Sequence, residues 1–152
     1  MKNFKFRAWS KAREKMINDC DLAITSDGSV LAGDLDYMGN SSMCPDVTDN
    51  VVIMLSTGLE DKNGVEIFEG DIVEFKYPYD KRIKTKGIIV RNDNKACFGV
   101  SMKETTEQYE LYRITAENYL TVIGDVYQNP ELLEDRYKWV TDLNKNLYKT
   151  IT

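Results

Sequence analysis

The sequence predicts a mainly β protein of the α+β class, built as an antiparallel β-barrel or sandwich with one C-terminal helix. Three observations lead to this prediction. Short apolar runs of strand length recur along the chain, and several of them alternate with polar residues. Turn-forming pairs, Asp27-Gly28 among them, separate these runs. Near the end, Asn129-Pro130-Glu131 combines an N-cap residue, a favoured first helical residue and a carboxylate that suits the helix dipole.

The N-terminal stretch FKFRAW, which starts at Phe4, alternates apolar and basic residues. A period of two predicts a half-buried strand with Phe4, Phe6 and Ala8 on one face. The following SKAREKM suits either a short helix capped by Ser10 or a hairpin that returns through Met16. We favour the hairpin, because so short a helix is unstable on its own.

A second hairpin is predicted around Asp27-Gly28, between the apolar runs DLAITS and SVLAG. Residues 33–50 are rich in Gly, Asn, Ser, Pro and Asp, which predicts a long irregular loop. Residues 51–55, VVIML, form a continuous apolar run that is typical of a strand buried on both faces.

The second half of the chain contains further strand signals. Residues 87–92 and 96–102 predict a hairpin, and residues 109–114 and 120–127 predict two more strands. Residues 130–143 predict a helix that packs on the sheet through a stripe of Leu132, Leu133, Arg136, Tyr137 and Val140. The apolar strand runs also predict four largely buried residues: Val73, Phe75, Ile89 and Val122.

The best patterned stretch is STGLEDKNGVEIFEGDIVEF, residues 56–75, which holds two turns followed by an alternating strand. Asp61, Asn63, Gly64 and Glu66 superficially suggest a calcium loop, but the order of glycine and carboxylates does not follow the EF-hand pattern. We therefore interpret the stretch as architectural. Gly70 permits a bend, and Asp71 can accept backbone N–H groups across it. Such a pair before an alternating strand is typical of a small SH3-like barrel.

Composition predicts a soluble protein with a single domain over residues 1–152. The net charge of -5 disfavours attraction of the whole surface to nucleic acid or to an anionic membrane. No apolar run is long enough to span a membrane, and the N-terminus lacks the apolar stretch of a signal peptide. We therefore expect a cytoplasmic protein, in which Cys20, Cys44 and Cys97 are reduced thiols.

The sequence contains no histidine. It therefore lacks the usual general base of serine and cysteine hydrolases and the commonest transition-metal ligand. We expect no cofactor and no metal site, and we favour a role other than catalysis. The alternative is a metal-dependent carboxylate enzyme whose ligands are Asp34, Asp36, Asp46 and Asp49.

The candidate binding site is the basic segment KYPYDKRIKTK, residues 76–86. Its five cations outnumber the single Asp80, which gives a local charge of +4 and leaves -9 on the rest of the chain. Cations neutralise phosphates and aromatic rings stack on unpaired bases, whereas the structural alternative is a solvated hairpin tip. The candidate binding residues are Lys76, Tyr77, Tyr79, Lys81, Arg82, Lys84 and Lys86.

Three blocks of the sequence together resemble the YopX-like family of phage and prophage proteins. They are KFRAW at residues 5–9 with the following KM, TGLEDKNGVEIFEGDIVEF at residues 57–75, and VIGDVYQNPELLE at residues 122–134. The resemblance implies a β-rich phage or prophage protein in a bacterial host, and it implies no activity and no catalytic residues. We therefore expect a non-catalytic binding module for a host or phage macromolecule, either protein or nucleic acid.

One alternative to this general binding module is a small β-barrel that binds nucleic acid. Exposed strand edges make homo-oligomers a further expectation.

Overall fold

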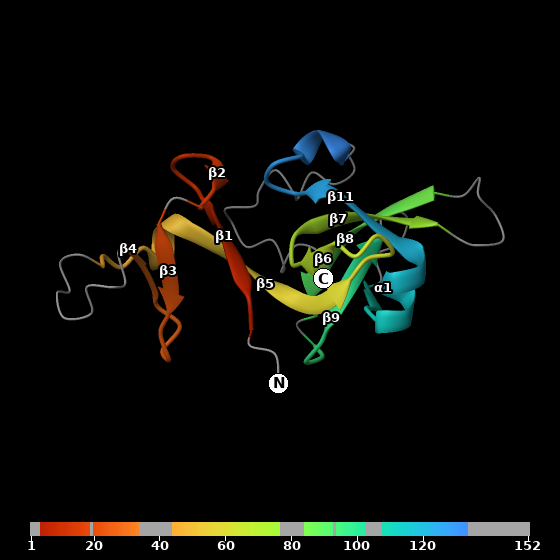
Figure 1. Cartoon of the computed structure of the whole chain (residues 1–152), viewed down its shortest axis with the longest axis horizontal. Coiled ribbons are helices and arrows are strands. Elements are labelled where there is room, and N and C mark those ends of the chain that lie inside the picture. Colours follow the sequence, from red (N-terminus) through yellow and green to blue (C-terminus); the bar gives the residue numbers. More distant parts are fainter. Residues whose placement is uncertain are drawn as a thin grey trace. The chain divides into compact units, whose positions relative to one another are not determined.

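The computed structural model describes residues 4–18, 20–33, 44–76, 84–92, 94–102 and 108–133 (Figure 1). Most of its regular structure is antiparallel β, which confirms the predicted mainly β fold class with a helix. The chain divides into two compact units, a larger one of Met1–Phe6 and Met54–Thr152 and a smaller one of Arg7–Ile53. The single domain over residues 1–152 and the SH3-like assignment stay predictions.

Two hairpins build the smaller unit, as the sequence predicts. Strand β1 (Phe6–Ser10) pairs with β2 (Lys15–Met16), and Trp9 lies opposite Met16. Strand β3 (Asp21–Ile24) pairs with β4 (Val30–Gly33) around a turn in which Gly28 has a φ of 88°. Glycine suits this turn because residues with a Cβ rarely adopt such a φ.

The core of the smaller unit is small. Its buried members are Ala8, Val30 and Val51, and its partly buried members are Ile17, Leu22, Val47 and Ile53. The expectation that Phe4 extends the buried face of Ala8 is wrong, because Phe4 is 95% exposed. Strand β1 begins only at Phe6, so the strand alternation does not reach Phe4.

Part of the predicted long loop contacts β4. Asp46 forms an isolated bridge with Leu31, and the N–H of Val47 donates to the carbonyl of Val30 at 2.8 Å. The short 3-10 helix η2 (Thr48–Asn50) then leads into the next strand. Residues 34–43 of the predicted loop lie outside the described residues.

Seven strands follow η2 in the described part of the chain: β5 (Val51–Glu60), β6 (Glu66–Phe68), β7 (Asp71–Lys76), β8 (Lys84–Arg91), β9 (Phe98–Met102), β10 (Gln108–Glu110) and β11 (Leu120–Asp125). Five of them form an antiparallel sheet in the order β10-β9-β8-β7-β11. The predicted strand at residues 51–55 is confirmed but continues to Glu60, and only its Val51 and Met54 are buried.

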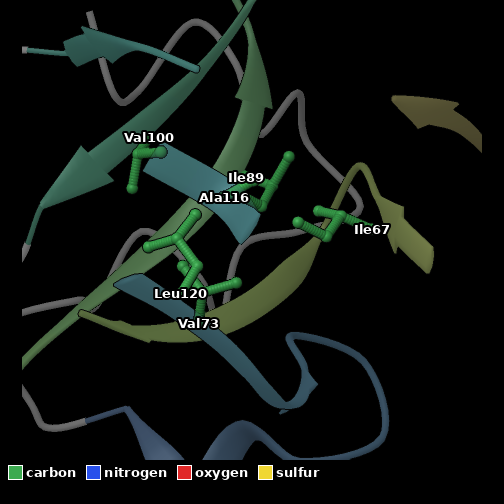
Figure 2. Close-up of a cluster of buried hydrophobic side chains, with 6 residues drawn as sticks. All are labelled: Ile67, Val73, Ile89, Val100, Ala116 and Leu120. Atoms are coloured by element: carbon green, nitrogen blue, oxygen red, sulfur yellow. The ribbon is translucent and has the colours of Figure 1, made fainter. Parts of the chain in front are cut away.

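Apolar residues cover both faces of this five-stranded sheet. On one face, six elements contribute the buried side chains of the larger core: Ile67, Val73, Ile89, Val100, Ala116 and Leu120 (Figure 2). Because successive strand residues point to opposite faces, Ile72, Ile88 and Val90 lie on the other face. Together with Val126, which follows β11, they form a second core. Leu132 and Leu133 pack against this second core.

The prediction that Val73, Phe75, Ile89 and Val122 are largely buried is confirmed for two of the four. Val73 and Ile89 are fully buried. Phe75 and Val122 are only partly buried and pack against the larger core. The aromatic ring of Phe75 also lies near that of Tyr119, with 5.7 Å between the ring centroids.

The structure corrects the predicted strand at residues 109–114. Strand β10 ends at Glu110, and Arg113 begins the helix α1 (Arg113–Tyr119). Ala116 of this helix is fully buried in the larger core, whereas Ile114 is 72% exposed. The helix therefore packs Ala116 into the larger core, although the local sequence pattern of this segment resembles a strand.

The structure also corrects the start of the predicted helix at residues 130–143. Pro130 begins only a 3-10 turn, η3 (Pro130–Leu132), and Leu133 has extended backbone angles. The side chain of Asn129 makes no capping hydrogen bond, because its Oδ1 accepts the N–H of Asp125 instead. Residues 134–143 lie outside the described residues.

Candidate functional site

Asp61, in the best patterned stretch of the sequence, is a buried carboxylate with three backbone donors. Its Oδ1 accepts the N–H groups of Asn63 at 2.8 Å and Val65 at 2.9 Å. Its Oδ2 accepts the N–H of Val122 in β11 at 2.9 Å. Asp61 therefore closes the turn between β5 and β6 and ties that turn to β11, which supports the architectural interpretation.

The second turn of the stretch depends on Gly70 and Asp71. Gly70 has a φ of 83°, and a Cβ at this position would lie 3.1 Å from the sulfur of Met54. The N–H of Phe68 donates to Oδ2 of Asp71 at 2.8 Å, which confirms the predicted contact across the bend. This turn leads into β7, which lies inside the sheet between β8 and β11.

Glu69, in the same turn, is also buried. Its Oε1 accepts the N–H of Leu55 at 3.0 Å. Its Oε2 lies 3.8 Å from Nε of Arg91, whose side chain is mostly exposed. Glu69 therefore fixes the turn to β5 and also pairs with a surface cation.

Asp125 has a similar role at the end of β11. Its Oδ1 accepts the N–H groups of Tyr127 and Gln128, both at 2.9 Å. Asp125 lies directly opposite Asp71 in the pairing of β11 with β7. Burial, and then the nearby carboxylates of Asp125 and Glu69, raise the pKa of Tyr127 to about 12.

The buried carboxylates described above therefore hold backbone turns together. In the described ranges, no group of three or more His, Cys, Asp or Glu side chains is placed to hold a metal ion. Asp46 is one of the four carboxylates considered as metal ligands. It accepts hydrogen bonds from the hydroxyl and the N–H of Thr48, and these bonds lower the pKa of Asp46. Asp49 lies in η2, and Asp34 and Asp36 lie outside the described residues.

Strand pairing brings three lysine positions of the basic segment to one face of the sheet. Lys76 lies opposite Lys84, and Glu74 lies opposite Lys86. Because alternate residues of a strand share a face, these positions lie on the same face as Ile72 of the second core. We call the positions of Lys76, Lys84 and Lys86 the basic end of the sheet.

Two of these lysines make contacts within the protein. Nζ of Lys76 lies 3.8 Å from Oε1 of Glu74. Nζ of Lys86 donates to the carbonyl of Leu132, at the end of η3, at 3.1 Å. Of the other candidate residues, Tyr77, Tyr79, Lys81 and Arg82 lie outside the described residues, and a partner for this segment stays a prediction.

A polar cluster that no sequence pattern indicates lies beside the turn between β8 and β9. Nζ of Lys95 lies 2.6 Å from Oε1 of Glu110, and the hydroxyl of Tyr112 donates to Oε2 of the same carboxylate. The hydrogen bond between Lys95 and Glu110 lowers the pKa of Glu110 and raises the pKa of Lys95. A hollow of about 630 Å³ adjoins this cluster and is lined by Arg91, Asn92, Asn94, Lys95, Ala96, Cys97 and Phe98.

Lys95 lies 15 positions before Glu110 in the sequence, and no local motif marks the contact. Cys97 lines the hollow, and Cys20, Cys44 and Cys97 form no disulfide with one another. None of the helices in the described part of the chain has the length and apolar character needed to cross a membrane.

The fold and these contacts define a small, mainly β protein whose buried acidic side chains stabilise turns and which has three lysine positions at one end of a sheet. A family model described as YopX protein matches residues 5–134. The chain therefore belongs to the YopX family, which confirms the resemblance seen in the three sequence blocks.

Two solved structures are similar to this chain over most of its length. Protein EF1440 from Enterococcus faecalis is 26% identical, with a TM-score of 0.59 over 87% of this chain and 99% of that one. Protein yopX from Bacillus subtilis is 27% identical, with a TM-score of 0.55 over 85% of this chain and 97% of that one. No curated protein matches this chain at a significant level.

Proposed function

We propose that this chain is a phage or prophage accessory protein that acts in the cytoplasm of a bacterial host as a non-catalytic binding module. Its contact surface for an anionic macromolecule is the basic segment at residues 76–86. The observation that carries the proposal is the basic end, where Lys76, Lys84 and Lys86 share a face with Glu74 in an acidic chain.

The contacts of the acidic residues favour binding over catalysis. A general acid or base needs a carboxyl group that can exchange a proton with a substrate. Asp61, Glu69, Asp71 and Asp125 are buried, and each accepts backbone N–H groups of the protein itself. These groups therefore support the fold rather than a reaction.

Nucleic acid is the second candidate partner, and the aromatic residues of the segment favour it. Tyr77 and Tyr79 lie beside the cations in the sequence, and aromatic rings next to cations suit unpaired bases and phosphates. An acidic protein would use the cations alone. Formation of homo-oligomers stays a separate prediction.

The test is a titration of labelled single- and double-stranded DNA and RNA at about 50 mM salt, where phosphate contacts are strong. The key variant replaces Lys81, Arg82 and Lys84 by Glu. The matched control replaces Lys11, Lys15 and Lys62 by Glu. These three lysines are exposed, and their replacement changes the net charge by the same amount.

We expect the wild type to bind weakly, with an affinity that falls steeply as salt is added, because most of the chain is acidic. The variant in the basic segment should lose binding while its thermal stability stays nearly unchanged. The control should keep most of its affinity. Equal loss in both variants would show that only net charge matters, and no binding by the wild type would exclude nucleic acid as the partner.

A further inference from the structure

The turn between β5 and β6 contains the only Asn-Gly pair of the sequence, Asn63-Gly64. Both residues are exposed. Gly64 has a φ of 80°, and a Cβ at this position would lie 4.0 Å from Oε2 of Glu60. Because glycine has no Cβ, no side chain on Gly64 hinders the approach of another group to its backbone nitrogen.

An asparagine that precedes glycine can react with the backbone that follows it. The backbone nitrogen of Gly64 gives its proton to water and attacks Cγ of Asn63. The new N–Cγ bond closes a succinimide ring while the Cγ–Nδ2 bond breaks, and the side-chain nitrogen takes up a proton and leaves as ammonia. Water then opens the ring at either carbonyl, which leaves aspartate or isoaspartate at position 63. Water is the only other reactant, and no group is oxidised or reduced.

Hydrogen bonds to Asp61 hold both peptide groups that flank the Asn63 side chain. Oδ1 of Asp61 accepts the N–H of Asn63 at 2.8 Å, and the backbone carbonyl of Asp61 accepts the N–H of Gly64 at 3.0 Å. The N–H of Asp61 donates to the carbonyl of Val65 at 2.8 Å. The attacking nitrogen is therefore a hydrogen-bond donor fixed in the turn, and it becomes free to react when the turn opens.

The carboxylate of Asp61 controls how often this turn opens. It is buried, and it accepts the N–H groups of Asn63, Val65 and Val122, the last of which lies in β11. Loss of this carboxylate removes three hydrogen bonds that close the turn and tie it to the sheet, so the opened turn becomes more populated.

We propose that Asn63 is a site of spontaneous deamidation and that Asp61 sets the rate of this modification by keeping the turn closed. Isoaspartate places an additional methylene group in the backbone, and both products add a negative charge two positions from Asp61. The modified turn therefore presents its N–H groups to Asp61 in a different geometry, and like charges repel. The modification loosens the turn between β5 and β6 irreversibly, and it is independent of the basic segment.

The site is tested by incubating the full chain at mildly alkaline pH and mapping its peptides over time by mass spectrometry. Asn94 is the internal control, because it is also exposed and its turn is also held by N–H groups that donate to a side-chain oxygen, Oδ1 of Asn92. Position 63 should be modified at least about fivefold faster than position 94, since Lys95 has a Cβ and Gly64 has none. The variant Asn63→Gln keeps the backbone N–H and should abolish the loss of ammonia at this position.

The role of Asp61 is tested by the rate of modification at position 63. The variant Asp61→Ala should raise this rate by about fivefold or more, because its turn opens more often. The matched control in the same turn, Lys62→Ala, removes an exposed side chain and should change the rate by less than about twofold. Because Asp61→Ala also lowers stability, the wild type in denaturing urea is a second measurement, and its rate should exceed that of the folded wild type by at least about tenfold.

Each outcome bears on one part of the proposal. Faster modification at position 63 than at position 94, with further acceleration by Asp61→Ala and by urea, supports it. Equal rates at the two positions, or loss of ammonia only from other asparagines, overturns the assignment of the site. A rate at position 63 that is the same in the folded wild type, in Asp61→Ala and in urea overturns the role of Asp61.

Discussion

At the scale of single residues, the buried carboxylates show how this fold uses acidic side chains. A carboxylate removed from water is unstable unless hydrogen-bond donors replace the lost solvent. Asp61 meets this condition with three backbone N–H groups, two in its own turn and one in β11. Hydrogen bonds to a charged acceptor are stronger than neutral ones. Asp61 therefore links two distant parts of the larger unit.

Replacement of Asp61 by Ala should lower the free energy of unfolding by about 3 kcal/mol, because it leaves three buried backbone donors without their acceptor. Urea unfolding measures this loss. The control is Asn63→Ala, which keeps the backbone N–H that Asp61 accepts and changes only an exposed side chain. The control should change the stability by no more than about 0.5 kcal/mol. A stability of the Asp61 variant equal to that of the control would show that water replaces the lost contacts.

At the scale of elements, β7, like β8, contributes buried residues to both cores of the larger unit. Its Val73 belongs to the larger core (Figure 2), and its Ile72 belongs to the second core. Further along the strand, burial decreases, and Phe75 is only partly covered. The start of β7 therefore lies between the two cores, and its last residue, Lys76, belongs to the basic end.

Because Phe75 is only partly enclosed, Phe75→Ala should destabilise the protein by about 2–3 kcal/mol, less than the roughly 3–5 kcal/mol for an enclosed phenylalanine. Val73→Ala removes only two methyl groups but from a fully buried site, and we expect a loss of about 2 kcal/mol. Ile114→Ala serves as the control, because Ile114 is mostly exposed. Denaturant unfolding measures the free energy of unfolding of the three variants. A loss of stability for Ile114→Ala as large as that for Phe75→Ala would contradict this assignment of burial.

At the scale of the whole molecule, the two compact units differ in the size of their cores. The smaller unit has one core with three buried residues. The larger unit has two cores, one on each face of its five-stranded sheet. Since burial of apolar surface is the main stabilising contribution in folding, local opening should require less free energy in the smaller unit.

Hydrogen exchange under native conditions tests this difference. The backbone amides of β3 and β4 should exchange at least about tenfold faster than those of β7 and β8, because regions with few buried contacts open at lower free energy. The paired amides of each hairpin provide the comparison within one sample. Equal protection of the two hairpins would show that the units open together.

Local chemistry made much of the fold predictable from the sequence. The hairpin turn at Asp27-Gly28 and the bend at Gly70-Asp71 need residues that tolerate these backbone angles, and such residues are visible in the sequence. Period-two alternation likewise indicated the strand at β7. For the candidate site, the sequence revealed only an excess of positive charge. That excess identified the basic segment but not the contacts of its lysines.

The sequence by itself determined the mainly β class, the hairpins, the turn at Gly70 and the family, because each depends on residues close together or on a recognisable pattern. Only the tertiary structure decided that Asp61 bonds to Val122 across 61 positions and that Lys86 bonds to Leu132 across 46. It also decided that residues 113–119 form a helix, in which Ala116 is buried in the larger core. The physical reason is that strand order and sheet packing bring distant groups together, and no local preference encodes which distant group each one meets.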